Sequence, residues 1–252
     1  MANLFKALAQ RARRGEIYST REYWNGKAEA LDGSSVSMWP NTHLNALYHT
    51  EQTVRLDDLL GDLAGHDALD VGCGTGRMSR FLTSRGASVT GTDFADSALD
   101  IARSVESDRP ISYRHESVFD LSDKAQYDLI TSWGVLVIAC RTVEELDKAL
   151  NRLRVSMRPG GRIMLMEPVH DSFLHRVLKL DQDGFLDAMH RAGFTVDQVE
   201  HFHFWPTRLM LAYIPWPAGF TRWVYRMGQS VMSVMFKRRR FGDYMLFVGR
   251  AT

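Results

Sequence analysis

The sequence predicts an α/β fold built on a doubly wound, mostly parallel sheet of seven strands. From residue 51 onward, short apolar segments alternate with segments of helical periodicity, as in a sheet covered by helices on both faces. A glycine cluster follows the first predicted strand, where a strand would turn into a helix. With 252 residues, 45% of them hydrophobic, the chain can bury such a core without disulfides or a structural metal.

The elements alternate regularly along the chain. Apolar and β-branched segments predict strands at residues 68–71, 88–92, 111–115, 127–132, 162–167, 195–204 and 244–249. Apolar residues at helical spacing predict helices at residues 53–65, 78–85, 97–105, 143–157 and 183–192. We expect the helix at 143–157 to end in a turn at residues 158–161, which read Arg-Pro-Gly-Gly.

The first 50 residues predict a helical lid over this domain. Residues 4–12 place apolar side chains on one face of a short basic helix, and residues 15–50 are rich in aromatic residues and Asn without strand alternation. The N-terminus lacks the apolar segment of a signal peptide, although its lack of acids also resembles a transit sequence. We therefore expect a cytoplasmic protein with a lid at 1–50 and a domain at 51–252.

Charge and cysteine content exclude several classes of protein. The net charge of +1 combines −6 in residues 1–200 (23 Lys and Arg, 29 Asp and Glu) with +7 in residues 201–252 (8 Lys and Arg, one Asp). Two cysteines, Cys73 and Cys140, rule out a disulfide framework. No uncharged apolar run is long enough for a membrane-spanning helix.

The glycine cluster, ALDVGCGTGR at residues 68–77, carries the clearest functional signal. Asp93 ends the next predicted strand, where an acid can accept hydrogen bonds from both ribose hydroxyls of an adenosine. The third glycine is Gly76, one residue earlier than a dinucleotide fingerprint requires. Asp70, just before the loop, could hold an amino group but would repel a pyrophosphate. The pattern favours a nucleoside that carries an amino acid over NAD.

From about residue 51 to its end, the chain resembles the class I S-adenosylmethionine-dependent methyltransferases. The motifs that carry the resemblance are, in order, LDVGCGTGR, VTGTDFADSALDIAR, YDLITSWGVLVI, LRVSMRPGGRIMLMEP and RAGF. The resemblance implies a Rossmann-like methyltransferase fold and S-adenosyl-L-methionine as the cofactor.

The resemblance also implies roles for the residues around the loop. Asp70 would anchor the loop and bind the methionine ammonium, directly or through water, unless it is only a helix cap. Asp93 would bind the ribose hydroxyls, and Phe94 would pack on the adenine. The loop backbone would pass beneath the methionine and the ribose at Gly72, Cys73, Gly74 and Gly76.

The adenine end departs from the family pattern. Many members have Asp and a small apolar residue after the third strand, where this chain has Ser117 and Val118. Ser117 can still hydrogen-bond the adenine amine, and Glu116 or Asp120 could replace it if the register slips. At the tip of the fourth strand, the resemblance implies that Trp133 and Gly134 face the methionine, although Trp133 could equally be a core residue. Cys73 and Cys140 fit best as small core side chains.

Methyl transfer is an in-line displacement, so the protein mainly has to align acceptor and donor. Aromatic faces near the cationic donor would help, and the chain offers Trp24, Trp39, Tyr48 and Trp133. An acceptor that must lose a proton needs a base, usually a histidine or a carboxylate. We expect His170, just past the fifth strand, to be that base; the alternatives are Glu167, His43 and His49.

Several motifs that the sequence lacks narrow the class of acceptor. The fourth strand ends in Ser-Trp-Gly-Val, without the Pro-Pro-aromatic motif used on amide or base nitrogens and without paired acids for magnesium. No Cys and His cluster has zinc spacing, so we expect no metal. We expect O-methylation of a small or lipid-linked metabolite, with N- or C-methylation as the alternative. An NAD-dependent oxidoreductase and a non-catalytic nucleotide-binding module are the rivals of another class.

An insertion at residues 205–240 precedes the last strand and holds most of the positive charge. Its apolar residues recur at helical spacing: Phe220, Trp223, Val224, Met227, Val231, Val234 and Met235. One interpretation is a flap that packs this stripe on the sheet and covers the acceptor pocket. The other is a peripheral contact with the inner face of a membrane, aided by the basic run at 237–240. Four adjacent cations would contact few phosphates of a nucleic acid. We therefore do not expect a nucleic acid as a partner.

Overall fold

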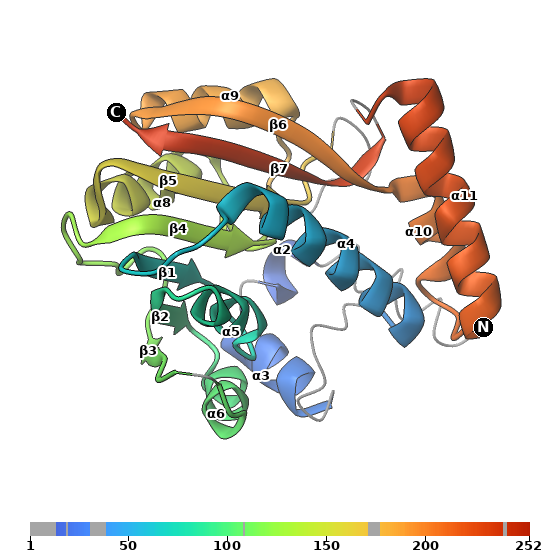
Figure 1. Cartoon of the computed structure of the whole chain (residues 1–252), viewed down its shortest axis with the longest axis horizontal. Coiled ribbons are helices and arrows are strands. Elements are labelled where there is room, and N and C mark those ends of the chain that lie inside the picture. Colours follow the sequence, from blue (N-terminus) through green and yellow to red (C-terminus); the bar gives the residue numbers. More distant parts are fainter. Residues whose placement is uncertain (1–13, 19, 31–38, 108, 171–176, 239–240) are drawn as a thin grey trace.

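The computed structural model describes residues 14–18, 20–30, 39–107, 109–170, 177–238 and 241–252. It contains one seven-stranded sheet in the order β3-β2-β1-β4-β5-β7-β6 (Figure 1). All neighbours pair in parallel except β7, which is antiparallel to both β5 and β6. The predicted α/β class, the seven strands and their mostly parallel arrangement are confirmed.

The strands lie close to their predicted positions. They are β1 (Asp67–Val71), β2 (Ser88–Asp93), β3 (Ser112–His115), β4 (Tyr127–Trp133), β5 (Met157–Glu167), β6 (Phe194–Phe204) and β7 (Gly242–Ala251). The prediction of a turn at residues 158–161 is wrong. These residues belong to β5, where they form an irregularity in its pairing with β4. There the pairing with β4 shifts between Tyr127 and Leu129, and Gly160 takes a φ of +75°.

The helices flank the sheet on both faces. They are α2 (Arg14–Ile17), α3 (Arg21–Ala30), α4 (Thr42–Leu60), α5 (Arg77–Ser84), α6 (Asp96–Ser104), α7 (Leu136–Ala139), α8 (Val143–Ser156), α9 (Gln182–Arg191), α10 (Trp205–Leu211) and α11 (Ala218–Phe236). Helix α4 begins at Thr42, where Asn41 caps it by accepting from the Leu44 amide, and ends at Leu60. It therefore runs through residue 50, where we expected the lid to meet the domain; that division remains a prediction. The basic helix expected at 4–12 lies outside the described residues.

Two apolar clusters occupy the two faces of the sheet, as a doubly wound fold requires. One packs α8 and α9 through side chains such as Leu150 and Phe185, and the other packs α4 and α5 through Leu56 and Leu82. The central strand β1 is buried at four of its five positions because helices cover both of its sides. None of the helices in the described ranges is long and apolar enough to cross a bilayer.

The carboxyl ends of the parallel strands point toward α4 and the helices of the insertion, α10 and α11 (Figure 1). In doubly wound sheets this edge is where ligands bind. The predicted insertion is confirmed, but the packing expected for its apolar stripe was wrong. Helix α11 buries Thr221, Val224, Tyr225, Gly228 and Met232, of which only Val224 belongs to that stripe. Most of the stripe faces outward, because burial of Gly228 and Thr221 brings α11 close to α10.

Candidate active site

The glycine loop joins β1 to α5 and is held against the end of β2. The Cys73 amide donates to the Thr92 carbonyl at 2.9 Å, and the Gly74 amide donates to Asp93 Oδ2 at 2.8 Å. Gly72, Gly74 and Gly76 all have positive φ values, of +64°, +53° and +76°. This backbone conformation strongly favours glycine, which explains the spacing of the motif.

The loop leaves space for a ligand at one of these glycines. A methyl group on Gly72 would lie 2.3 Å from Val135 Cγ2, whereas one on Gly74 would meet no protein atom within 4 Å. The amide of Gly74 also contacts the Asp93 carboxylate, the side chain expected to bind a ribose. The residues present therefore fit an adenosine that carries an amino acid.

Replacing Gly72 and Gly74 by alanine should separate folding from ligand binding. G72A should lower the free energy of unfolding by about 2–4 kcal/mol, because it adds overpacking against Val135 to backbone strain. G74A should cost only the strain of about 1–2 kcal/mol, but its methyl group should enter the ligand space. Urea unfolding and calorimetric titration with S-adenosylhomocysteine measure the two effects. Equal stability losses in the two variants would contradict the loop geometry.

Asp70 lies in the interior, beneath the loop. Its Oδ2 accepts from Ser79 Oγ at 2.6 Å and its Oδ1 accepts from Thr131 Oγ1 at 3.3 Å. Burial raises the pKa of Asp70 to about 6, although both hydroxyls favour its ionised form. These contacts suit a residue that anchors the loop between α5 and β4, and the ammonium contact remains a prediction.

Asp93 combines burial with several backbone donors. Burial raises its pKa, while the amides of Ala95, Gly74 and Phe94 oppose that rise by stabilising the carboxylate. Its Oδ1 accepts from the Ala95 amide at 2.8 Å, so the side chain is fixed at the end of β2. Phe94 follows it and is half-buried.

The expected adenine contacts follow β3. Ser117 begins a turn, in which the Asp120 amide donates to its carbonyl at 2.9 Å, and Val118 is buried. Glu116 is engaged in an ion pair with Arg114, 2.7 Å between Oε2 and Nη2. Asp120 is exposed. Glu116 is therefore held by a partner of its own, and the contact of Ser117 with the adenine remains a prediction.

Trp133 and Gly134 lie at the tip of β4, beside helix α4. The Gly134 amide donates to the Met166 carbonyl at 2.8 Å, which holds the tips of β4 and β5 together. Trp133 Nε1 donates to Gln52 Oε1 of α4 at 3.3 Å. Helix α4 therefore contacts the strand tip where the methionine is expected.

Glu167, an alternative base, instead holds the backbone after β4. Its oxygens accept from the amides of Val135, Leu136 and Val137, each at 3.2 Å. Burial raises the pKa of Glu167 to about 7, and these amides act in the opposite direction. With both oxygens used at the start of α7, Glu167 serves as a structural acid.

His170 lies in a buried ionic cluster at the same edge. Its Nε2 is 3.3 Å from Asp243 Oδ1, and Arg208 Nε is 2.7 Å from that oxygen. The Tyr48 hydroxyl donates to Asp243 Oδ2 at 3.2 Å. All four side chains are buried, so α4, α10, β7 and the segment after β5 meet around one carboxylate.

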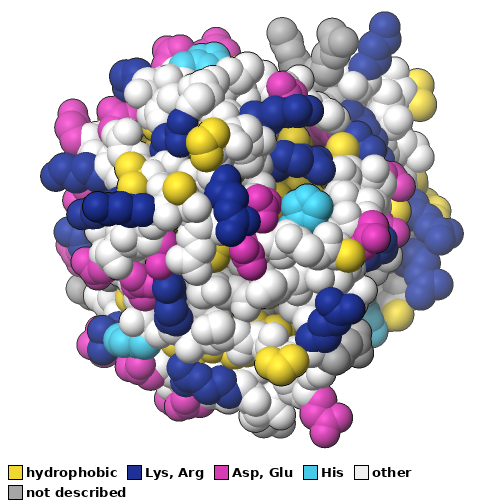
Figure 2. All heavy atoms as spheres, turned by 60° about the vertical axis from the view of Figure 1, so that its left-hand side comes forward, with side chains coloured by type: hydrophobic (Ala, Val, Ile, Leu, Met, Phe, Trp, Pro, Cys, Tyr) yellow, Lys and Arg dark blue, Asp and Glu magenta, His cyan; other side chains and the backbone are white. Residues whose placement is uncertain are grey.

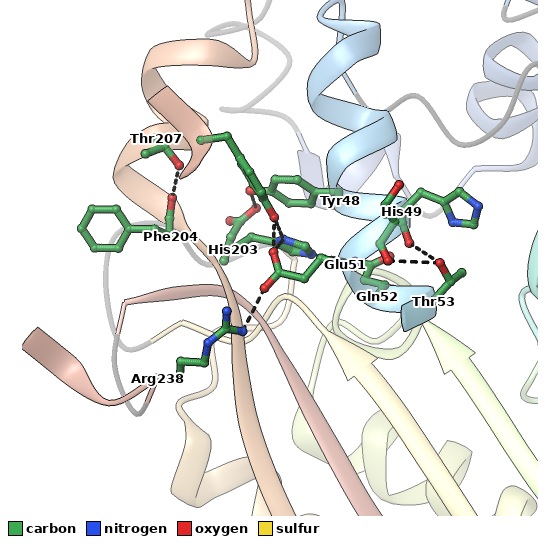
Figure 3. A network of polar contacts seen from close by, with 12 residues as sticks. Tyr48, His49, Glu51, Gln52, Thr53, His203, Phe204, Thr207 and Arg238 are labelled. Atoms are coloured by element: carbon green, nitrogen blue, oxygen red, sulfur yellow. Dashed lines mark hydrogen bonds and ion pairs between the residues drawn. The ribbon is translucent and has the colours of Figure 1, made fainter. Parts of the chain in front are cut away.

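A second histidine, His203 at the end of β6, joins a chain of hydrogen bonds (Figure 3). Its Nδ1 lies 2.7 Å from the Tyr225 hydroxyl, which donates to Glu51 Oε2. Its Nε2 lies 3.1 Å from Gln52 Nε2, and Arg238 Nη1 donates to Glu51 Oε1 at 2.9 Å. Since Gln52 uses its oxygen on Trp133, its amide must donate to His203 Nε2. When His203 is neutral, its proton is therefore on Nδ1.

Strain and stacking set His203 apart from the other histidines in the described part of the chain. Its φ is +59°, a conformation that non-glycine residues adopt at a cost of about 1–3 kcal/mol and that clusters at functional sites. Its ring stacks on Tyr48 at 3.5 Å between centroids. The His203 network and the Asp243 cluster thus touch through Tyr48.

Glu51 should make the stability of the protein depend on acid pH. Burial opposes its ionisation, but hydrogen bonds and charge from His203, with Tyr225 and Arg238, lower its pKa to about 2. A carboxyl with a depressed pKa in the folded state contributes stability above its ordinary value of 4.5, and this is lost as pH falls toward 2. Between pH 5 and pH 3 the wild type should lose about 2 kcal/mol more unfolding free energy than E51Q.

Urea unfolding at several pH values tests this prediction. E106Q, a change at an exposed glutamate, is the matched control and should keep the pH dependence of the wild type. Parallel curves for the wild type and E51Q would contradict the role given to Glu51.

The remaining residues considered from the sequence are two histidines of α4 and two cysteines of the core. His43 is exposed on α4, whereas His49 contacts Arg77 at the start of α5. Burial and the charge of Arg77 lower the pKa of His49 to about 4, so it is neutral near pH 7. Cys73 and Cys140 are both buried, and burial raises the pKa of each thiol.

The aromatic residues expected near the cationic donor lie in different parts of the fold. Trp39 and Tyr48 are buried together in the apolar cluster that packs α4 and α5, with their ring centroids 4.9 Å apart in an edge-to-face arrangement. Trp24 lies elsewhere, packed on α6 through Ala95 and Ala98.

Sequence reasoning missed Glu51, Gln52, His203, Arg208 and Asp243. Asp243 carried a usable signal, since it is the sole acid in the last 52 residues. A lone acid beside a buried strand suggests a paired charge. The others gave no comparable signal, because their partners lie on elements distant in the sequence.

Comparison with known proteins agrees with this geometry. Residues 68–161 match the family model described as "Methyltransferase domain". A ubiquinone biosynthesis O-methyltransferase of Idiomarina loihiensis is 33% identical over 145 residues, covering 56% of this chain and 55% of that protein. A second, from Alkalilimnicola ehrlichii, is 33% identical over 123 residues, or 46% and 48% of the two chains. The chain spans about half the length of the curated relatives it matches.

Solved structures share the fold over a longer stretch. The magnesium protoporphyrin IX methyltransferase of Synechocystis, crystallised with bound S-adenosylmethionine, superposes with a TM-score of 0.61 at 16% identity. The match covers 92% of this chain and 95% of that one. Residues 68–161 thus match a methyltransferase domain, and the sheet as a whole has the fold of S-adenosylmethionine-dependent methyltransferases.

Proposed function

We propose that this protein transfers a methyl group from S-adenosylmethionine to an oxygen of a small or lipid-linked metabolite. The observation that carries the proposal is the glycine loop tied to Asp93, at the same sheet edge as two histidines that face carboxylates. The names of the O-methyltransferase relatives support oxygen as the acceptor atom. Methylation of nitrogen or carbon is the alternative.

The loop residues would bind and orient the cofactor. Bound S-adenosylmethionine supplies an electrophilic methyl carbon on its sulfonium. Asp93 would accept from the ribose hydroxyls, and the open side of Gly74 would receive the ligand. Asp70 would keep the loop in register with α5 and β4, and Trp133 and Gly134 would border the methionine. Phe94, Ser117 and Val118 would contact the adenine.

His170 would remove the proton of the acceptor hydroxyl. Its Nε2 lies 3.3 Å from Asp243 Oδ1, which orients the imidazole. The Asp243 carboxylate would stabilise the imidazolium that results, while the burial of the cluster excludes water.

We also propose a peripheral location on the inner face of a membrane, with contact through residues 205–240. The positive charge of the chain is concentrated there. A membrane at this place would lie near the insertion that borders the acceptor side, which suits an acceptor with a hydrophobic part.

Cofactor titration and turnover test the proposal together. Calorimetry should detect binding of S-adenosylmethionine but not of NAD, and radiolabelled methyl groups should appear on hydroxylated aromatic acceptors, with and without a prenyl chain. Binding of NAD alone would indicate an oxidoreductase. Binding of S-adenosylmethionine without transfer to any acceptor would indicate a nucleotide-binding module.

Replacing His170 by asparagine should lower kcat about 10²–10⁴-fold, the usual contribution of a general base. The dissociation constant of S-adenosylhomocysteine should stay the same, since His170 is not expected to touch the cofactor. H43N changes an exposed histidine of the lid and is the matched control. Full turnover by H170N would assign proton removal to another group.

A further inference from the structure

Helix α11 presents an apolar and basic face to solvent. Trp223 is 59% exposed and Val234 79% exposed, and Phe220, Met227 and Met235 are also exposed. The opposite side of the helix is buried through Val224, Tyr225 and Met232. Large apolar side chains grouped on one exposed helix face are unusual for a surface that only contacts water.

Cations lie among these apolar side chains. Arg222 and Arg226 are exposed on the same side, and Lys237 and Arg238 follow the C-terminal end of the helix. The sequence has no Asp or Glu between Glu200 and Asp243. Elsewhere the charges are mixed: the face seen in Figure 2 shows acidic and basic side chains interspersed, with hydrophobic ones in small separate groups.

An open cavity of about 570 Å³ lies along this face. The described residues that line it include Trp223, Met227 and the two arginines Arg222 and Arg226. Indole, thioether and guanidinium groups therefore border one hollow, which combines apolar surface with positive charge.

From this face we infer a docking surface for an anionic lipid bilayer. Trp, Phe and Met side chains insert at the boundary between headgroups and acyl chains, while arginines pair with lipid phosphates. A second copy of the chain fits less well, because a two-fold contact would bring the same cations together. The charge and the apolar side chains thus complement a single surface of anionic lipid.

The docking surface adjoins the proposed acceptor site. Tyr225, on the buried side of α11, donates to Glu51 in the His203 network, and Arg238 reaches the same carboxylate. A bilayer against the outer side of α11 would lie one helix diameter from this network. The inference rests on the proposed function only where it places a lipid-linked acceptor, because docking itself needs neither acceptor nor cofactor.

Co-sedimentation of the full chain with vesicles tests the docking surface. Vesicles of phosphatidylglycerol and phosphatidylcholine should bind the wild type, those of phosphatidylcholine alone should not, and 0.5 M salt should weaken the binding. R222Q/R226Q should lower the partition coefficient about 30-fold, the effect expected from two cations near an anionic surface. K148Q/R152Q removes the same charge from the exposed side of α8 and should change it less than twofold.

A second pair of variants tests how much the apolar side chains contribute to vesicle binding. V234S should lower the partition coefficient about fivefold, whereas V155S, at the exposed Val155 of α8, should leave it unchanged. Circular dichroism checks that all variants are folded. Equal vesicle binding by R222Q/R226Q and K148Q/R152Q would overturn the inference. So would absence of vesicle binding together with a dimer in sedimentation velocity that V234S disrupts.

These outcomes are distinct from failure of the proposed function. Vesicle binding without cofactor binding would leave the docking surface standing and remove methyl transfer. Cofactor binding and turnover without vesicle binding would leave methyl transfer standing and remove both the docking surface and the proposed peripheral location.

Discussion

Replacing Asp243 by alanine should lower the free energy of unfolding by about 3–5 kcal/mol. Arg208 is almost fully buried, and its guanidinium lies against the Asp243 carboxylate at 2.7 Å. Burial alone would lower the pKa of Arg208, but the charge of Asp243 raises it, so the guanidinium stays charged. Removing the carboxylate leaves a buried cation without compensation, one of the most destabilising single changes known.

A matched pair on the surface provides the control. Arg250 and Asp197 form an ion pair of similar length, 3.1 Å, but both side chains are exposed. D197A should therefore cost no more than about 1 kcal/mol in urea unfolding. If D243A and D197A were equally stable, the Asp243 cluster would not have the energetic role given to it.

Replacing Asp93 by alanine should weaken binding of S-adenosylhomocysteine by about 1–3 kcal/mol, or roughly fivefold to 150-fold. The carboxylate is expected to accept from the ribose hydroxyls, and it also accepts from the Gly74 and Ala95 amides at 2.8 Å each. The variant would lose both the ligand contact and the tie that holds the loop. Calorimetric titration measures the effect directly.

Two further variants make this result specific. D100A changes a highly exposed acid on the neighbouring helix α6 and should bind the ligand like the wild type. D93N keeps one acceptor oxygen and should fall between the wild type and D93A. Unchanged binding in D93A would contradict the place of the ribose and, with it, the orientation of the cofactor.

Both effects arise at one edge of the sheet but depend on different physics. Asp93 acts through a short, local arrangement in which a strand end faces a glycine loop. Asp243 acts through burial, because the buried Arg208 needs its carboxylate to compensate the charge in the folded protein. The D93A change should therefore appear mainly in ligand binding, and the D243A change mainly in the free energy of unfolding.

Much of the fold could be predicted because its signals are local. Strand and helix periodicity placed all seven strands, and the glycine spacing identified the loop. The errors arose where contacts between elements overrode the local signal. Pro159 and Gly160 indicated a turn, but pairing with β4 keeps this segment in β5 as an irregularity. The apolar stripe of α11 indicated burial, yet close packing at Gly228 turns a different side of the helix inward.

The sequence by itself determined the sheet, the glycine loop and the acid at the end of β2, since each depends on neighbouring residues and on backbone conformations that few residue types adopt. Only the tertiary structure decided which side chains meet at the carboxyl edge of the sheet. Tyr48 reaches Asp243 across 195 residues of sequence, and Gln52 reaches His203 across 151. These contacts exist because β7 inserts between β5 and β6 and α4 crosses their ends. Periodicity cannot specify such an arrangement, because it records how each segment is buried and not which segments share the same edge.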